Sequence, residues 1–293
     1  MSGERLRNRK VGLIGCGDLG LRLAARLLAE GAEVTGFRRN VEKLPEGITP
    51  CRMDVTDPSS LERLSDFSFD YVVVTLTPPS LSEASYRTTY VEGLRAILTH
   101  LPRERLRKLF WVSSSSVYGQ SDGSVVDELS PTRPERFPGR IQREAEQQVE
   151  LLGSQGCIVR FSGIYEGEGH SLLEKLRRGE LGSRVESDYY TNRIHRDDCA
   201  GVLAHLILRD ASGLPLAPRY LASDCEPVLY SELIGWLARE TGLPLNPDLS
   251  SVTPRTGSKR CCNRRLIESG YNFRYPSFRE GFREALALSR SAP

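Results

Sequence analysis

Short runs of apolar residues alternate along the chain with segments in which apolar residues recur every three or four positions. The runs predict strands at residues 11–14, 33–37, 48–54, 71–77, 108–112, 157–161 and 219–222. The periodic segments predict helices around residues 23–28 and at 57–64, 80–101, 138–152, 171–178, 197–208, 231–241 and 278–286. Strands that alternate with helices are typical of an α/β fold, and we expect a doubly wound parallel sheet of about seven strands.

A glycine-rich turn joins the first predicted strand to the first predicted helix. Its sequence, G-C-G-D-L-G, fits G-x-G-x-x-G in the strand–turn–helix context that a dinucleotide-binding Rossmann fold requires. The first glycine permits a tight turn, the second lets the backbone approach a pyrophosphate, and the third lets the helix pack closely. The alternative is a glycine-rich turn in another kind of α/β protein. We expect the pyrophosphate to lie on the helix N-terminus, against Gly15, Cys16, Gly17, Asp18, Leu19 and Gly20.

The ends of the second and third strands carry further candidate cofactor contacts. Arg38 and Arg39 follow the second strand, and no Asp or Glu occupies that position. An acidic residue there would bind the ribose 2′-hydroxyl of NAD, whereas arginine suits a 2′-phosphate. The sequence therefore favours NADP as the cofactor, with NAD as the alternative. The remaining alternative is that both arginines are merely solvated. Asp54 and Val55 end the third strand. They could contact the edge of an adenine ring, or Asp54 could be a simple turn aspartate, and the two interpretations are equal alternatives.

The fourth and fifth strands end in segments suited to ligand binding. Pro78 and Pro79 break the fourth strand at its carboxyl end, and Ser80 with Glu83 predicts a capping box for the next helix. Four serines, 113–116, follow the fifth strand. Hydroxyl groups at this edge of the sheet can donate to a substrate carbonyl beside a nicotinamide. A serine-rich loop without chemistry is the alternative.

Composition and charge exclude several classes of function. The 293 residues carry a net charge of +2, which gives no argument for nucleic acid or an anionic membrane as a partner. The seven cysteines form no C-x-x-C motif, and no apolar run approaches the ~20 residues of a membrane span. Without a signal peptide, this composition predicts a reduced, cytoplasmic protein. No His, Cys and Asp set has metal-ligand spacing, so we expect no metal.

Four motifs in matching order give the chain a specific resemblance. They are the glycine turn, S-S-S-S-V-Y-G at 113–119, I-V-R-F-S-G-I-Y at 158–165 and N-R-I-H-R-D-D at 192–198. Together they resemble the extended and atypical short-chain dehydrogenase/reductases, the NAD-dependent epimerase/dehydratase superfamily, over essentially the whole chain. The segment G-S-K-R at 257–260, followed by Asn263 and Arg265-Leu266, is similar to the atypical bacterial branch.

The resemblance implies a domain organisation and roles by position. It implies an NAD(P)-binding Rossmann domain at residues 1–164, and a mixed region at 165–293 that completes the sheet and forms a small C-terminal substrate lobe. Ser114 takes the place of the family's catalytic Ser or Thr. The ribose would be lined by Leu76, Thr77 and Pro78. The nicotinamide would be flanked by Ser113 and by the segment from Ser162 to Ile164, which includes Gly163.

The chain departs from the family at its acid/base pair, and this departure matters more for function than all the matches. The family's acid/base pair, Tyr-x-x-x-Lys, aligns with Pro138 and Gln142, and a slip of one residue gives Phe137 and Ile141. Neither a phenol nor an ammonium group is present. Another acid could serve, namely Tyr118, Tyr165 or His195, although His195 is better interpreted as structural. Otherwise Ser114 alone would polarise the substrate during hydride transfer, or the protein would bind the dinucleotide without turnover.

Two other segments have an open interpretation. The charged, proline-rich segment from residue 126 to 138 is either a lid over the active site or a surface loop. Arg177, Arg178 and Arg184 could meet an anion, but solvated side chains are the better interpretation.

Three functions fit these observations. The first is an NAD(P)-dependent oxidoreductase of atypical short-chain type, acting on the carbonyl or hydroxyl of a small polar or sugar-like molecule. The second is a non-catalytic dinucleotide-binding redox sensor or scaffold, which Pro138 and Gln142 favour. A nucleotide-sugar epimerase is the weakest, because epimerisation depends on the missing Tyr. By analogy with the superfamily, a homodimer could form through the helices at 80–101 and 138–152.

Overall fold

The computed structural model describes residues 4–165, 172–184, 188–250 and 257–291. By its internal contacts the chain divides into two compact units that interleave in sequence. Unit 1 comprises Met1–Val117, Pro134–Arg160 and Cys199–Tyr220, and unit 2 comprises Tyr118–Arg133, Phe161–Asp198 and Leu221–Pro293. This division differs from the single boundary expected at residue 164, because the chain passes between the units several times.

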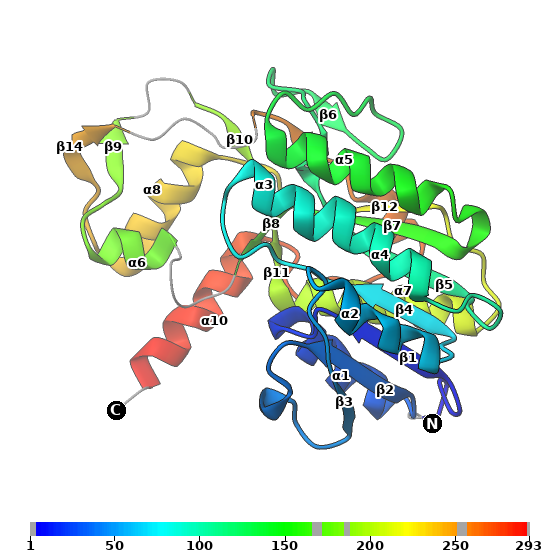
Figure 1. The fold of residues 1–293 in the computed structure, drawn as a ribbon. Helices are drawn as coiled ribbons and strands as arrows, with labels where there is room; N and C mark the ends of the chain where they lie inside the picture. The colour runs from blue at the N-terminus through cyan, green and yellow to red at the C-terminus, as the bar shows by residue number, and fades with distance from the viewer. Residues whose placement is uncertain (1–3, 166–171, 185–187, 251–256, 292–293) are drawn as a thin grey trace. The chain divides into compact units, whose positions relative to one another are not determined.

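A seven-stranded sheet confirms the predicted doubly wound fold (Figure 1). β1 lies between β2 and β4 and pairs in parallel with both, so the strand order reverses at the carboxyl end of β1. In open α/β sheets ligands bind at such a switch point. The order across the sheet is β12 (Arg219–Ala222), β7 (Gly156–Phe161), β5 (Lys108–Ser114), β4 (Tyr71–Val74), β1 (Lys10–Ile14), β2 (Glu33–Arg38) and β3 (Ile48–Arg52).

Amphipathic helices cover this sheet. Figure 1 shows α4 (Gly93–His100) and α5 (Phe137–Glu150) in front of it and α7 (Arg196–Ala211) behind it. The front face buries one apolar cluster, in which Leu94 and Ile97 of α4 and Ile141 of α5 meet Val72 and Trp111 of the strands. The remaining elements of unit 1 are α1 (Asp18–Ala29), α2 (Pro58–Leu61), α3 (Glu83–Tyr86) and the short helical turns η1 (Val41–Lys43), η2 (Glu62–Asp66), η3 (Arg87–Glu92), η4 (Ser115–Val117) and η5 (Gly153–Gln155).

Several boundaries differ from those that the apolar pattern predicts. β3 ends at Arg52, and β4 ends at Val74, ahead of Pro78, whose ring nitrogen cannot donate to a ladder. The predicted capping box at Ser80 is wrong. The helix begins at Glu83, and Ser82 caps it by accepting from the Ser85 N–H. The predicted helix at 80–101 also contains a π-helical segment, η3, between α3 and α4.

Unit 2 is built from short strand pairs and four helices around its own core, among the residues that the structure describes. The pairs are β6 (Val125–Val126) with β15 (Arg260–Cys261), β8 (Gly163–Tyr165) with β11 (Arg193–His195), β9 (Gly182–Arg184) with β14 (Asn246–Ser250), and β10 (Tyr190–Thr191) with β13 (Val228–Leu229). The shorter helices are α6 (Leu172–Arg177), α8 (Tyr230–Thr241) and α9 (Arg264–Glu268), and α10 (Phe278–Ser291) is the longest. Leu176, Trp236 and Phe282 belong to the shared apolar core of α6, α8 and α10.

The first half of the predicted lid is part of unit 2. β6 pairs with β15, and the buried carboxylate of Glu128 accepts from the Leu221 N–H at 2.9 Å. Arg265 lies 3.7 Å from the same carboxylate. These contacts fix the segment to the unit's own frame, and its role as a lid stays a prediction. Among the described residues, no helix is both long and apolar enough to cross a bilayer.

Candidate functional site

The turn after β1 is closed so tightly that only glycine fits its first position. Gly15 has φ +84°, and a Cβ on it would lie 2.7 Å from the carbonyl oxygen of Thr75. The N–H groups of Gly15 and Cys16 both donate to the Phe37 carbonyl, at 3.0 and 2.9 Å. The Thr75 hydroxyl donates to the Gly15 carbonyl at 2.8 Å. Thr75, which sequence reasoning missed, thus ties the turn to the strand beside it.

The next two glycines have different surroundings, as the motif predicts. A Cβ on Gly17 would meet nothing closer than the Gly15 carbonyl at 3.8 Å, so the space above it is open. A Cβ on Gly20 would lie 3.3 Å from the Cys16 sulfur, which is where α1 packs onto the turn. The first bond within α1 runs from the Leu21 N–H to the Gly17 carbonyl. The N–H groups of Asp18, Leu19 and Gly20 therefore have no acceptor within the helix and can bind phosphate oxygens.

Cys16 has a structural side chain. The thiol is fully buried, and burial raises its pKa to about 11 while nearby Arg38 opposes the rise. It therefore stays a neutral thiol under the glycine turn. The side chain of Asp18 pairs with Arg22 on the same helix, at 3.2 Å. The backbone of Cys16 and Asp18, and not their side chains, shapes the glycine turn at residues 15–20, which we call the cradle.

Arginines gather where β2 and β3 end. Arg38 is half-buried and lies near the Cys16 thiol, while Arg39 is exposed. Arg52 on β3 is the register partner of Arg38, so their backbones are adjacent. None of these three guanidinium groups forms an ion pair or side-chain hydrogen bond with the residues that the structure describes. Arg52 was missed in the sequence, because its position beside Arg38 depends on strand register.

The other predicted contacts of the adenosine half divide into turn and packing residues. The Asp54 carboxylate accepts from the backbone N–H and the hydroxyl of Thr56, at 3.0 and 2.8 Å. The geometry is that of a turn aspartate. Val55 lies against Gly93 at the start of α4, since a Cβ on that glycine would approach its side chain within 3.3 Å. After β4, Leu76 packs against the main core, Pro78 is half-buried and Thr77 is exposed.

Ser113 is bound into a buried ion pair. Its hydroxyl donates to the Glu146 carboxylate at 2.7 Å, and Arg160 donates to both oxygens of that carboxylate, at 2.8 and 2.7 Å. Glu146 and Arg160 are at most 1% exposed. Breaking such a pair costs about 3–5 kcal/mol, because one charge is left buried and uncompensated. The Ser113 side chain therefore holds α5 to β5, and its hydroxyl is not directed at a ligand.

Ser114 is the better-placed hydroxyl. It is half-buried at the last position of β5, and its oxygen accepts from the Ser116 N–H at 3.1 Å. This bond uses a lone pair and leaves the hydroxyl proton for a ligand. Because hydrogen bonds polarise one another, an oxygen that accepts from a backbone N–H is a stronger donor through its own proton.

The structure describes the two positions on α5 that align with the family's Tyr and Lys. Pro138 is in the first turn of the helix, and Gln142 is 5% exposed, with a side-chain hydrogen bond to Tyr90. The Gln142 oxygen is buried without a hydrogen-bond partner. The amide therefore occupies the interior of unit 1 beside an aromatic ring, where an ammonium group would have been costly.

Tyr86, which sequence reasoning also missed, supplies a phenol beside the start of α5, where Pro138 aligns with the family's Tyr. It is half-buried, and its ring meets the edge of Phe137, the residue before Pro138, at 5.3 Å between centroids. Its hydroxyl has no hydrogen-bond partner among the residues described. Only the packing of α3 on α5 could have identified it.

The predicted substitutes in unit 2 are less available. Tyr118 is 2% exposed. The Tyr165 hydroxyl donates to the Ser277 carbonyl at 3.4 Å, and burial raises its pKa above the usual range. His195 is buried, and its Nδ1 accepts from the Asp197 N–H at 3.2 Å, which agrees with the structural interpretation.

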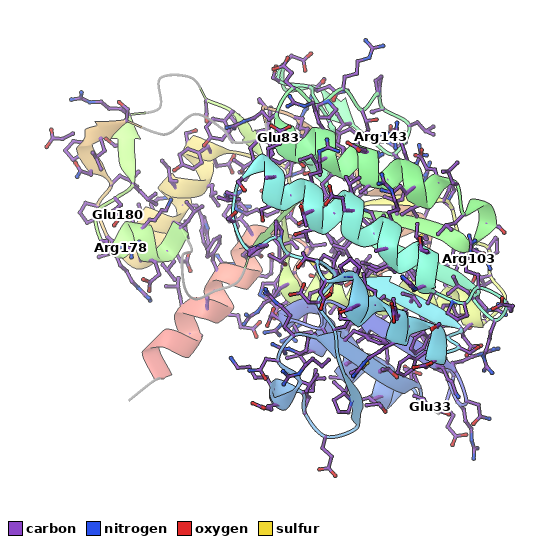
Figure 2. The ribbon with its side chains drawn as sticks, viewed as in Figure 1. Glu33, Glu83, Arg103, Arg143, Arg178 and Glu180 are labelled. Carbon is purple, nitrogen blue, oxygen red and sulfur yellow. The ribbon has the colours of Figure 1, made fainter. Side chains whose placement is uncertain are left out.

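The remaining predicted contacts of unit 2 are at its surface. Gly163 and Ile164 are exposed on β8. Beyond α6, Arg178 and Glu180 form an ion pair of 2.8 Å (Figure 2), and Arg177 lies 3.6 Å from Glu174. These arginines are solvated and paired, as expected.

The cradle of unit 1 fits a nicotinamide dinucleotide. Three helix N–H groups and the open space above Gly17 suit the pyrophosphate, and unpaired arginines lie at the end of the neighbouring strand. The geometry of the switch point is therefore compatible with a dinucleotide site.

Comparison with known proteins agrees with this geometry. The model of the NAD(P)H-binding family matches residues 15–210. The solved structure of an NAD-dependent epimerase/dehydratase from Methylobacillus flagellatus is 35% identical, with a TM-score of 0.79, and the match covers 97% of this chain and 99% of that one.

Two curated bacterial proteins are more distant relatives. Protein YeeZ of Escherichia coli is 25% identical over 288 residues, which is 92% of this chain and 97% of its own. The 2-alkyl-3-oxoalkanoate reductase of Shewanella oneidensis is 24% identical over 251 residues, covering 78% of this chain and 65% of its own. With the glycine cradle, the sheet order and these matches together, the chain belongs to the NAD(P)H-binding family, within the epimerase/dehydratase superfamily of short-chain dehydrogenases/reductases.

Proposed function

We propose that this protein is an NADP-dependent reductase of a small carbonyl compound, with Ser114 as the group that polarises the carbonyl. The observation that carries the proposal is the state of Ser114. It ends β5 at the carboxyl edge of the sheet and keeps its proton available, whereas Ser113 is held by Glu146. A hydroxyl that served only to stabilise the fold would be expected to use its proton as Ser113 does.

The preference for NADP rests on the arginines of β2 and β3. Arg38, Arg39 and Arg52 have no carboxylate partner among the described residues, and an unpaired cluster of this kind suits a 2′-phosphate. Replacing Arg38 and Arg39 together by Ser should weaken NADPH binding at least tenfold and change NADH binding little. Arg26→Ser on α1 is the control, and an equal loss for both dinucleotides would refute the assignment.

The proton balance needs a second group. When bound, the reduced dinucleotide supplies a hydride to the carbonyl carbon, and the carbonyl oxygen then requires a proton. Ser114 donates a hydrogen bond to that oxygen, and we assign the proton donor to Tyr86, whose hydroxyl is without a partner among the described residues. An acid/base group of this kind contributes about 10²–10⁴-fold to the rate.

The substrate class is suggested by one curated relative, a reductase named for 2-alkyl-3-oxoalkanoates. Acetoacetate and its 2-methyl derivative are therefore the first probes, with NADPH oxidation as the signal. Ser114→Ala and Tyr86→Phe should each lower kcat/KM at least a hundredfold with NADPH affinity unchanged. Tyr90→Phe is the matched control, since that hydroxyl already bonds Gln142. A Ser114→Ala variant as active as the wild type would refute the mechanism.

A second function is favoured by a separate observation. Pro138 and the buried Gln142 leave α5 without an acid/base pair, which suits a protein that binds the dinucleotide without turnover. Tight NADPH binding with no oxidation across a panel of carbonyl compounds would support this redox-sensor or scaffold function over the reductase.

A further inference from the structure

Unit 2 contains a guanidinium group that lies near a buried carboxyl, that of Asp224, but does not form an ion pair with it. Arg193 on β11 is half-buried, and its Nη1 donates to the Thr191 hydroxyl. No carboxylate among the described residues forms an ion pair with it. Buried charges in proteins are normally paired, because an uncompensated charge away from water is costly. The missing partner of Arg193 is therefore to be sought in a ligand.

Two more polar groups without partners lie on the segments that frame Arg193. The Oδ2 atom of Asp224 and the hydroxyl of Ser162 are buried and form no hydrogen bond within the described structure. Asp224 and Ser162 are 1% and 5% exposed. Buried polar atoms almost always form hydrogen bonds. Two buried atoms without such bonds, near a guanidinium group without an ion pair, therefore indicate a ligand-binding site.

Backbone hydrogen bonds hold these three residues in one frame. The Asp224 N–H donates to the Arg193 carbonyl at 2.6 Å, and the Ser162 N–H donates to the Ala222 carbonyl at 3.0 Å. Gly163, next to Ser162, is the register partner of Arg193 in the β8–β11 pair. Asn263 donates to the carbonyls of Ser223 and Asp224, at 2.9 and 3.1 Å. The frame is rigid, because every strand in it is tied to the next.

The groups offered by this frame are hydrogen-bond donors. Burial raises the pKa of Asp224 to about 8, although Arg193 opposes the rise, so the side chain carries a proton at neutral pH. Its hydroxyl, the Ser162 hydroxyl and the guanidinium group of Arg193 are each able to donate a hydrogen bond. A planar group with two acceptor oxygens matches that set, and the guanidinium fork binds a carboxylate through two parallel bonds.

The surrounding charge argues for a single negative charge on the ligand. Glu226, on the same loop as Asp224, and Glu280 on α10 both act on Asp224 and would repel a dianion. We infer that Arg193, with Asp224 and Ser162, binds the carboxylate of a small monoanionic ligand. The inference goes beyond the proposed function, because carboxylate binding within unit 2 needs no dinucleotide.

Calorimetry of the full-length protein without dinucleotide tests the inference at pH 7. Acetoacetate is the probe, acetoacetamide is its neutral match, and inorganic phosphate is the competing anion. Acetoacetate should bind and acetoacetamide should not. Arg193→Gln should weaken acetoacetate at least tenfold, and Arg193→Lys should weaken it less. Arg184→Gln, an exposed arginine on β9 of the same unit, should leave binding unchanged.

Three outcomes of the binding comparison, and a fourth from the variants, would overturn the assignment. The first three are no acetoacetate binding to the wild type, equal binding of the amide, or tighter binding of phosphate. An equal loss in Arg184→Gln and Arg193→Gln would also refute it. If Arg193→Gln does not fold, the comparison of acid with amide on the wild type still decides. Failure here with normal NADPH binding would leave the proposed function intact, whereas loss of NADPH binding alone would refute only that function.

Discussion

A methyl group at Gly15 would collide with the Thr75 carbonyl oxygen at 2.7 Å, whereas a methyl group at Gly17 would meet nothing closer than 3.8 Å. Gly15 is therefore required by the protein's own backbone. Gly17 is not required by the protein's own packing, and we propose that it is required by a pyrophosphate that approaches the turn from outside. The two glycines look alike in the sequence, and only the distances to their surroundings separate the structural role from the binding role.

Changing each glycine to alanine should separate the two roles. Gly15→Ala should lower the free energy of unfolding by about 1–3 kcal/mol, because the residue is held at positive φ against a carbonyl. Gly17→Ala should leave stability within about 0.5 kcal/mol of the wild type, as for an open site, and weaken NADPH binding at least tenfold. Urea denaturation and a fluorescence titration measure these effects. Full NADPH affinity in Gly17→Ala would show that no pyrophosphate approaches there.

Whole elements were more predictable than their ends. All seven strands of the sheet were predicted. A central strand such as β4 is easy to recognise because it is covered on both faces and apolar throughout, whereas the edge strand β3 is partly exposed. The pattern failed where polar contacts decide, as at Ser80, where the neighbouring Ser82 is the residue that caps the helix. It could not reveal Thr75, Tyr86 or Arg52, whose roles depend on neighbours distant in sequence.

The close approach of α5 to the turn after β5 gives a prediction for that helix. A Cβ on Gly139 would lie 2.2 Å from the Ser116 carbonyl, so Gly139→Ala must push α5 away from the turn that holds Ser114. We expect a loss of about 1–3 kcal/mol in unfolding free energy, as for other overpacked sites. The rate of any carbonyl reduction should fall together with the stability of the Gly139→Ala variant.

A second helical glycine provides the control for that experiment. On α8, a Cβ at Gly235 would meet only the flexible end of Arg239, at 3.5 Å. Gly235→Ala should therefore stabilise the protein by up to about 1 kcal/mol through helix propensity alone. Chemical denaturation of both variants checks the pair, and similar effects at the two sites would contradict the close packing of α5.

For the whole molecule, the sequence indicated the fold and the cofactor cradle but not the division into units. The motifs follow one another along the chain, and a boundary at residue 164 was the simplest expectation. Instead, segments 118–133 and 221–293 share a unit through the β6–β15 pair and the Glu128 carboxylate. Such long-range pairing leaves no periodic signal. The proximity of Asp224 to Arg193 was missed for the same reason.

The stability of the molecule should depend on pH through Asp224. Burial raises the pKa of this carboxyl to about 8, with Glu226 and Glu280 adding to the rise and Arg193 opposing it. In the unfolded chain the group loses its proton near pH 3.9, about its ordinary pKa. Between these pH values the folded state holds the extra proton, so the free energy of unfolding falls as pH rises.

Asp224→Asn removes this titration and should be compared with the wild type from pH 5 to pH 8.5. The free energy of unfolding of the variant, relative to that of the wild type, should rise across this window. The difference should become constant above about pH 8, where both the folded and the unfolded wild type have lost the proton. Urea denaturation at each pH measures the difference. Parallel curves for the two proteins would show that Asp224 is ionised in the folded state throughout.

The central claim is that the turn after β1 is a dinucleotide cradle with a 2′-phosphate site beside it. Titration of the wild-type protein with NADPH and with NADH, followed by nicotinamide fluorescence, tests that claim most directly. The account predicts saturable binding of one NADPH per chain, weaker binding of NADH, and loss of the difference in the Arg38→Ser/Arg39→Ser double variant. If neither dinucleotide bound at millimolar concentration, the account would be contradicted at its base.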